Sequence, residues 1–582
     1  MRILSLLLTI SLLLSALAGC GSADSTSATT VGSSGSTTSQ SVPSTTTQTT
    51  PATDPVTTPD VTDKKPITEP VTPPAPEGTG VLVSLSMPVA DNLTLVQDLS
   101  FTVDEDTRTA TLALSYDTYA DLATLSDARL VSLAEGGEVS FAPLTDAGGV
   151  DLTADAVCKV TDENGGVKIY RLTVDRTVYR LPIVNITLEN GKAVNTIDRN
   201  LTTTMTFSLD CSGVEGYESI GNVSGTIRGR GNSTWKWDKK PYKIKLDKKE
   251  SLLGLDDNRD WILLANYADK SLIRNTLAYE MGRVLDQLVW SPHSYPVDLF
   301  VNGEYQGVYA LGEHMEVAGG RVDIEEGSLE VDTDYLLEIG GMAPTGDVNG
   351  VHYFHTDGRL VRFATFKSPD FEEITDEQKK FLTDYFQKAE NAIKKGEGYE
   401  AFIDVDSFVD WIILHELAYN LDSCFRRSCF LVKEKGGKIR MGPIWDFDLA
   451  FGNFSRDNKN YDDWITIGKP TEGDETPYVQ YNWCTYLMRD EEFCDRLAQR
   501  WEEVRDRLLS VANDTIDTYG ALLNGGSQQE NYEVWKVWDV RTGYQSRWCK
   551  EANTYEKQLQ YLRDFLEKRA KWMDTAIPKL PT

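Results

Sequence analysis

The hydrophobic pattern of the 582-residue chain changes near residue 375, and this change limits the folds that the chain can adopt. Before it, short runs alternate apolar and polar residues and are separated by Gly, Asn and Asp, which is typical of strands joined by turns. After it, apolar residues recur mainly at helical spacing, beginning with the capping signature at Thr375. The pattern predicts an α+β chain with a β-rich front, a helical back and a cleft between the two lobes.

The first 79 residues are predicted to lie outside the folded part. Residues 1–20 have a basic start, a short apolar core and the ending LAGC, which resembles a bacterial lipoprotein signal peptide with a lipobox. Cys20 is then the lipidated first residue of the mature protein, and the alternative is an ordinary signal peptide with an incidental cysteine. Residues 21–79 are rich in Ser, Thr and Pro and cannot bury enough apolar surface to fold, so they are expected to form a disordered tether.

Two folded parts are expected after the tether. Residues 80–187 contain short alternating runs and the hairpin signal ENGG, which predict a small all-β sandwich of immunoglobulin-like topology. No cluster of catalytic groups occurs there, so this part is expected to be a spacer or an adhesive module. Residues 188–578 are expected to form the main domain.

Charge and cysteine content exclude several classes of function. The formal net charge is −31 and the pI is near 4.6, which argues against nucleic acid as a partner because phosphate contacts need a positive surface. The eight cysteines have no paired CxxC spacing and give no zinc signature. Cys424 and Cys429 are close enough in sequence to pair, but buried free thiols are the favoured interpretation.

Familiar catalytic motifs are absent from the predicted domains. The sequence has no GxxxxGK[ST], and the HEL segment lacks the second histidine of a zinc protease helix. With only five histidines in the chain, any chemistry is expected to rely on carboxylates.

The segment MGPIWDFDLAFG carries the strongest candidate pair. If Ile439–Trp445 is a strand, Asp446 and Asp448 project from one side while Phe447 turns into the core. Two such carboxylates attract a hard divalent ion, because Mg²⁺ prefers oxygen ligands and completes its shell with water and phosphates. The alternative is that the pair caps a turn or a helix.

A third acid precedes this pair. Asp422 follows a predicted helix, and a predicted hairpin with a Gly-Gly turn separates it from Asp446. Protein kinases have the same order: a catalytic aspartate, a hairpin, then a metal-binding aspartate followed by phenylalanine. This order favours phosphoryl transfer.

A basic segment in the front half is a candidate nucleotide cradle. The glycine-interrupted run GTIRGRGNSTW offers donors from Arg230, Asn232 and Ser233. In the following strand KKPYKIKL, Lys243 and Lys245 share one face, where a lysine can meet phosphates. The alternative is a solvated edge strand protected by lysines.

Several separated motifs together resemble the spore coat protein H (CotH) kinase family over about residues 188–575. They are RGRGNSTW, KKPYKIKLDKK, DWILLANYADKSLIRNTLAYE, VNGEYQGVYALGEHM and GPIWDFDLAFG. The resemblance implies an atypical protein-kinase-like domain with two lobes, which transfers phosphate from ATP to serines of partner proteins.

The resemblance also implies roles for individual residues. Asp422 matches the catalytic aspartate and Asp446 a magnesium ligand, while Ser428 stands where members often carry asparagine, a better metal ligand than a hydroxyl. The loop near the nucleotide is matched by Arg230, Gly231, Asn232 and Ser233, and the phosphate-facing lysine by Lys240 or Lys243.

Three further residues have two interpretations each. Arg274 is a candidate for phosphate binding, but pairing with Asp269 is favoured. Glu280 either forms the ion pair that holds the lysine or lies on the surface, and Glu313 is a candidate for orienting the cleft. The tryptophans near these motifs are expected to be core residues rather than ligand platforms: Trp235, Trp261, Trp445 and Trp483.

These observations predict a lipid-anchored, extracytoplasmic membrane protein that uses ATP and Mg²⁺ or Mn²⁺ to phosphorylate a Ser/Thr-rich protein. The alternative is a non-catalytic surface module that attaches partner proteins or cell-wall glycans. A glycan-cleaving enzyme ranks last, because two acids on one segment need not face a scissile bond from opposite sides.

Overall fold

The computed structural model describes residues 76–581, with gaps at 93–94, 96, 115–119, 121, 176–180, 327, 341–352, 371, 455–460, 468–480, 543 and 547–550. The predicted signal peptide with Cys20, nearly all of the predicted tether, and Cys549 lie outside the described residues. None of the described helices is long and apolar enough to cross a membrane.

Two antiparallel-rich sheets begin the described chain. One contains β1 (Val81–Met87), β2 (Leu99–Ser100) and β5 (Val131–Glu135); the other contains β3 (Thr102–Asp104), β4 (Thr109–Ala113), β6 (Glu138–Ala142), β7 (Val157–Thr161) and β8 (Val167–Asp175), and α1 (Leu122–Ser126) lies between β4 and β5. Leu85 of one sheet and Leu112 of the other share a single buried cluster, because alternate residues of each strand face inward. The predicted ENGG hairpin joins β7 to β8 through Gly165 at φ +78°.

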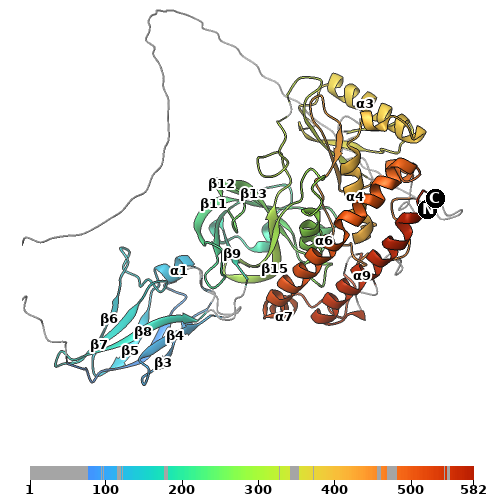
Figure 1. Cartoon of the computed structure of the whole chain (residues 1–582). Helices are drawn as coiled ribbons and strands as arrows, with labels where there is room; N and C mark the ends of the chain where they lie inside the picture. The colour runs from blue at the N-terminus through green and yellow to red at the C-terminus, as the bar shows by residue number, and fades with distance from the viewer. Residues whose placement is uncertain are drawn as a thin grey trace, which may run out of the picture. The chain divides into compact units, whose positions relative to one another are not determined.

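A closed seven-stranded barrel follows (Figure 1). Its strands, in order around the barrel, are β10 (Thr203–Asp210), β11 (Ile220–Gly229), β12 (Tyr242–Glu250), β13 (Asn258–Leu264), β15 (Glu304–Glu313), β14 (Ser294–Val301) and β9 (Ile183–Leu188). The parallel pairing of β9 with β14 closes it, so the barrel begins upstream of residue 188. Ile244 and Trp261 fill the interior, which leaves their chain neighbours on the outer face.

A second, open sheet lies among the helices. It has the order β17 (Tyr353–Phe354), β18 (Ala364–Ser368), β16 (Tyr335–Ile339), β19 (Cys429–Lys433) and β20 (Ile439–Met441). The predicted hairpin with the Gly-Gly turn is β19–β20. Strand β16 joins this hairpin to strands formed much earlier in the chain.

The helical back is confirmed. Its helices are α3 (Asp376–Lys395), α4 (Val405–Ala418), α5 (Trp483–Leu487), α6 (Glu491–Asn524), α7 (Ser527–Val534) and α9 (Tyr555–Ala576), and α2 (Arg274–Gly282) lies in the front half. Short 3₁₀ turns occupy Glu189–Gly191, Val194–Thr196, Thr234–Lys236, Tyr399–Ala401 and Ile577–Lys579. Thr375 caps α3 in a complete capping box with Gln378. Helices α4, α6 and α9 pack against one another (Figure 1).

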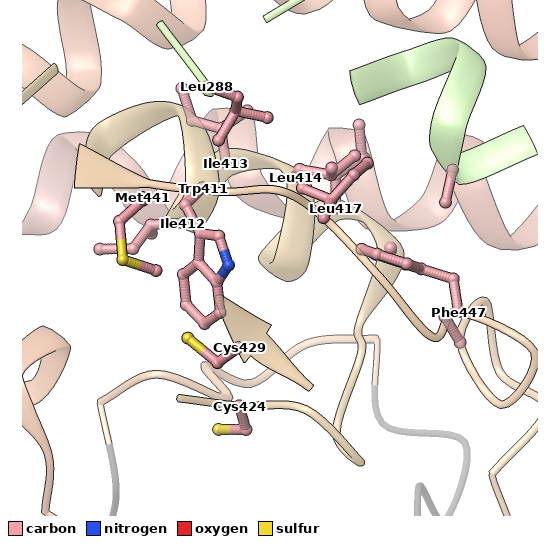
Figure 2. Packing of buried hydrophobic residues seen from close by; sticks show 14 of the residues in the cluster. Leu288, Trp411, Ile412, Ile413, Leu414, Leu417, Cys424, Cys429, Met441 and Phe447 are labelled. Carbon is pink, nitrogen blue, oxygen red and sulfur yellow. The ribbon is translucent and has the colours of Figure 1, made fainter. Parts of the chain in front are cut away.

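Helix α4 lies at the centre of the largest buried cluster, and Figure 2 shows part of this cluster, including Trp411, Cys429 and Phe447. His415 stacks on Trp411 at 3.8 Å between ring centroids and lies 5.0 Å from the Phe447 ring. Burial lowers the pKa of His415 to about 3, so this histidine is a neutral core residue. Cys424 and Cys429 are buried free thiols, as the favoured interpretation predicted.

Candidate active site

The segment with Asp446 and Asp448 is a turn rather than a strand. Strand β20 ends at Met441, so the prediction of a strand reaching Trp445 is wrong. The chain turns at Gly442, whose φ of +91° suits glycine, and Asp446 itself has a φ of +68°. The turn still directs the side chains as predicted, because Phe447 is fully buried while both aspartates remain partly exposed.

Two asparagines hold this turn in place. Asn275 of α2 accepts a hydrogen bond from the Phe447 backbone amide at 2.8 Å. Asn420, in the loop after α4, donates to the backbone carbonyl of Asp446 at 3.1 Å. Buried amide side chains of this kind fix a backbone position, since an unpaired amide in the core is costly. Residues from both halves of the domain therefore position Asp446.

Asp422 lies in the loop that follows α4, near the other two acids. Its charge raises the pKa of both Asp446 and Asp448. Asp422 Oδ1 lies 3.3 Å from Arg427 Nη1 and 3.8 Å from Arg426 Nη2. The structure thus brings the three predicted carboxylates into one neighbourhood.

This neighbourhood has an excess of negative charge. Burial first, and then Asp422, raise the pKa of Asp446 from 3.8 to about 6, although Arg230 and the Ser428 hydroxyl act in the opposite direction. Burial and the neighbouring aspartates hold the pKa of Asp448 well above its usual range. A cation at this position would relieve the repulsion, because it stabilises the charged form of each acid.

The acids fit a magnesium-type ion held jointly with phosphates. The described residues contain no group of three or more His, Cys, Asp or Glu side chains arranged to hold a metal by themselves. Mg²⁺ commonly takes only one or two carboxylates and fills its shell with water and phosphate oxygens, so a full set of protein ligands is not required. The Ser428 hydroxyl donates to Asp446 Oδ2 at 3.1 Å and lies beside the same position.

Arg230 connects these acids to the barrel. Its guanidinium lies 5.6 Å from the centroid of the Trp445 ring, and its charge interacts with Asp446 and Asp448. Trp445 stacks on Tyr279 of α2 at 6.1 Å. Trp445 also packs on an apolar patch of the barrel formed by Ile262, Leu264 and Ala310. Because Trp445 is partly exposed and touches a cation, it is not a simple core residue.

The barrel presents a basic face around His314. Lys243 of β12 stands directly across from Arg228 of β11, and both point outward because Ile244 faces the interior. Burial and the charges of Lys243, Arg230 and Arg228 lower the pKa of His314 well below 6.5, so His314 is neutral. The Nδ1 atom of His314 is buried and has no hydrogen-bond partner among the residues that the structure describes. Arg230, whose charge reaches both His314 and the two aspartates, connects the basic face to the acids.

Residues 227–573 match the family described as CotH kinase protein, a span of more than half the chain. The chain belongs to the CotH kinase family. Among curated proteins, none matches the chain. The matched span runs from β11 into α9, so it contains the acids and the basic face and excludes the two N-terminal sheets.

Within this CotH kinase domain, Lys243 and Lys240 have different surroundings. Lys243 Nζ lies 2.8 Å from Asp260 Oδ1 on the basic face. Lys240 Nζ instead donates to the backbone carbonyl of Trp235 at 2.9 Å and lies over the Trp235 ring. Lys240 therefore fastens its own loop, and Lys243 is the better candidate for a phosphate contact.

The loop residues after β11 also differ from one another in their surroundings. Gly231 has a φ of +84°, and a Cβ there would lie 2.1 Å from Thr234 Oγ1, so only glycine fits this turn. Asn232 accepts a hydrogen bond from Arg199 at 2.5 Å, and Ser233 is exposed. Of the predicted nucleotide-loop side chains, Arg230 is the one whose charge interacts with the acids.

Arg274 is a structural residue. It is fully buried, forms an ion pair with Asp269 and donates from Nε to the Ala450 carbonyl at 3.2 Å. The favoured pairing is confirmed, and the placement of Arg274 among the cofactor-binding residues is corrected, because an enclosed side chain cannot reach a phosphate. Glu280 pairs with Arg283 rather than with a lysine, and Glu313 accepts a hydrogen bond from the His293 amide at 2.7 Å.

Several site residues were not predicted. Asp260 pairs with Lys243, while Arg228 and His314 complete the basic face. The outward alternation in TIRGR was a usable signal for Arg228. No local signal indicates that Asp260 and His314 meet Lys243, because this depends on the pairing of β12, β13 and β15 in the barrel.

Proposed function

We propose that the CotH kinase domain of this chain transfers the γ-phosphoryl group of ATP to a Ser or Thr hydroxyl of a partner protein. One observation carries the proposal: Asp446 and Asp448 interact with Asp422 on one side and with Arg230, which extends the basic face of the barrel, on the other. Phosphoryl transfer needs this combination, because its catalysis consists mainly of positioning and charge neutralisation.

Each group has a distinct task in the proposed reaction. ATP bound with Mg²⁺ or Mn²⁺ supplies the phosphoryl group and neutralises charge on the phosphates. Asp446 and Asp448 hold the ion, and Lys243 and Arg230 bind phosphate oxygens. Asp422 orients the acceptor hydroxyl and accepts its proton.

The test uses the mature chain with labelled ATP, Mg²⁺ or Mn²⁺, and a Ser/Thr-rich protein acceptor. Asp422→Asn and Asp446→Asn should each lower transfer on the order of 10²–10³-fold. The matched control is Asp155→Asn, since Asp155 is 92 % exposed in the N-terminal sheets, outside the family match. Undiminished transfer by both active-site variants would refute the assignment.

A non-catalytic binding module is the second candidate, and Ser428 is the observation that favours it. The Ser428 hydroxyl is a poorer metal ligand than an asparagine carbonyl, so the second ion of a kinase site has weak support here. The Tm is measured with ATP, in the presence and absence of Mg²⁺. A rise in Tm shows that the chain binds nucleotide, because a ligand that binds the folded state stabilises it. Mg²⁺-dependent stabilisation without transfer to any acceptor would favour the binding module.

The proposed location is the outer face of the cell membrane, with a lipid on Cys20 as the anchor and the cell wall as a further contact. This part of the proposal rests on the sequence LAGC and the tether that follows it. Membrane fractionation tests the anchor. The wild-type chain should sediment with membranes, and the Cys20→Ala variant should not. A Cys20→Ala chain that remains in the membrane fraction would overturn the anchor.

A further inference from the structure

Two arginines contact Asp422, and two more share a surface depression with one of them. Arg426 and Arg427 belong to the loop between α4 and β19, and Arg359 and Arg362 belong to the turn between β17 and β18. Arg359, Arg362 and Arg426 line one shallow depression of about 20 Å³, which admits no more than the end of a side chain. In a chain with a net charge of −31, three arginines around one depression are a local cluster of positive charge.

These arginines are accessible to a partner to different degrees. The side chain of Arg427 is 39 % exposed, Arg359 is exposed and Arg362 is partly buried. The side chain of Arg426 is only 10 % exposed, so it borders the surface rather than projecting from it. Among the residues that the structure describes, Arg359 and Arg362 form no ion pair. Arg426 and Arg427 both contact Asp422, the group that must meet the acceptor hydroxyl in the proposed reaction.

We propose that this arginine surface, formed by Arg359, Arg362, Arg426 and Arg427, selects acceptor segments whose Ser or Thr is flanked by Asp or Glu. The inference rests on the proposed function, and it adds the class of acceptor. An acceptor hydroxyl at Asp422 places the neighbouring acceptor residues near Arg426 and Arg427, and Arg426 shares its depression with Arg359 and Arg362. Arginine binds carboxylates through paired hydrogen bonds, so acidic flanks fit this surface and basic flanks are repelled.

The same contacts connect acceptor binding to catalysis. In the free protein Arg427 Nη1 lies 3.3 Å from Asp422 Oδ1, where it competes with an acceptor hydroxyl for that oxygen. An acidic flank offers Arg427 another carboxylate and leaves Asp422 to the hydroxyl. The hydroxyl oxygen then bonds to the γ-phosphorus, its proton passes to Asp422, and the bond from the γ-phosphorus to ADP breaks with its electron pair on ADP.

Binding without ATP tests the surface alone. Fluorescence anisotropy at low salt would compare short labelled peptides that differ only in having Glu, Gln or Lys around one Ser. The mature chain should bind the Glu peptide about tenfold more tightly than the Lys peptide, because electrostatic complementarity governs such discrimination. Equal affinity for the three peptides would overturn the inference.

Variants locate the effect. Arg359→Gln combined with Arg362→Gln should remove most of the preference, whereas Arg359→Lys should retain it. Arg171→Gln is the charge-matched control, since Arg171 is 66 % exposed on β8, outside the family match. An unchanged preference in the double variant, with its thermal unfolding also unchanged, would refute the assignment to this surface.

Transfer assays with the same peptides separate the two proposals. If no peptide is phosphorylated and the Glu peptide still binds best, the kinase proposal fails and the arginine surface stands as a docking site for acidic segments. If the Glu and Lys peptides are phosphorylated with equal kcat/KM, the kinase proposal stands and the acceptor inference fails.

Discussion

Two ion pairs of this protein, each between an arginine and a carboxylate, differ in how deeply they are buried. Arg569 of α9 and Glu416 of α4 form an ion pair at 2.6 Å in which both side chains are fully buried. Arg427 and Asp422 form a looser pair at 3.3 Å in which both side chains are partly exposed. The first pair is enclosed, and the second is partly open to solvent. Burial therefore separates an arginine that holds the fold from one that serves a site.

The hydrogen bonds of Arg569 support this distinction. Besides Glu416, Arg569 donates from Nη1 to the backbone carbonyls of Tyr461 at 2.9 Å and Asp463 at 2.7 Å. Glu416 in turn accepts from the Thr466 amide at 2.7 Å. This network holds the 461–466 segment against α4 and α9, so Arg569 serves the fold.

The largest expected effect comes from breaking the buried pair. Arg569→Met should lower the free energy of unfolding by about 3–5 kcal/mol, because it leaves the Glu416 charge buried without its partner. Arg427→Met should change it by less than about 1 kcal/mol, as is usual for exposed pairs. Urea unfolding measures both. Equal losses in the two variants would contradict the comparison.

The next effect is on activity rather than stability. Asp446→Asn should lower kcat/KM for transfer on the order of 10²–10³-fold, the usual cost of removing an electrostatic group from an active site. Its free energy of unfolding should stay the same or rise, because the substitution removes repulsion with Asp422 and Asp448. Parallel assays of transfer and urea unfolding check both parts. A large loss of stability would place Asp446 with Arg569 as a residue that holds the fold.

The raised pKa of Asp446 predicts a smaller, pH-dependent effect. Its pKa is about 6 in the folded protein against 3.8 ordinarily, so the folded state binds more protons than the unfolded state between these values. Stability should therefore fall as the pH rises through this interval, and Asp446→Asn should flatten that part of the curve. Thermal unfolding across the interval measures the slope.

Adding Mg²⁺ with ATP to the same thermal unfolding experiment tests whether Asp446 is a metal ligand. Because protons and Mg²⁺ compete for the carboxylates, the increase in Tm caused by Mg²⁺ with ATP should be larger at about pH 7.5 than at about pH 5. Asp446→Asn should show a small increase at both. An Mg²⁺ effect that does not change with pH would exclude Asp446 as a ligand.

Local signals predicted much of the fold, since they depend on neighbouring residues. The capping box at Thr375 requires only Gln378 three positions on, and the β14–β15 turn requires only Asn302 and Gly303, both at positive φ. The closure of the barrel was not predictable in the same way. It depends on β9 pairing in parallel with β14, across more than a hundred residues, and no short pattern encodes that partner.

The site residues also divide into those that local sequence indicated and those that depend on distant strand pairing. The order of Asp422, a hairpin and Asp446 was readable, because these acids lie on one continuous stretch of chain. The strand predicted before Asp446 exists but was predicted to be too long, since alternation alone did not indicate a turn at Gly442. Asp260 became visible only when β13 was paired with β12.

The smallest expected effect concerns Ser428, which contacts Asp446 in the candidate active site. Its hydroxyl donates to Asp446 at 3.1 Å, so Ser428→Ala should lower stability by no more than about 1 kcal/mol, the usual net value of one hydrogen bond. Ser428→Asn should instead strengthen Mg²⁺-dependent ATP binding, because an amide carbonyl is a better ligand than a hydroxyl. Calorimetric titration of each variant with ATP at fixed Mg²⁺ compares them, and Ser428→Ala is the control for loss of the hydroxyl alone. If Ser428→Asn binds no more tightly than Ser428→Ala, then Ser428 only positions Asp446 and takes no part in holding a second ion.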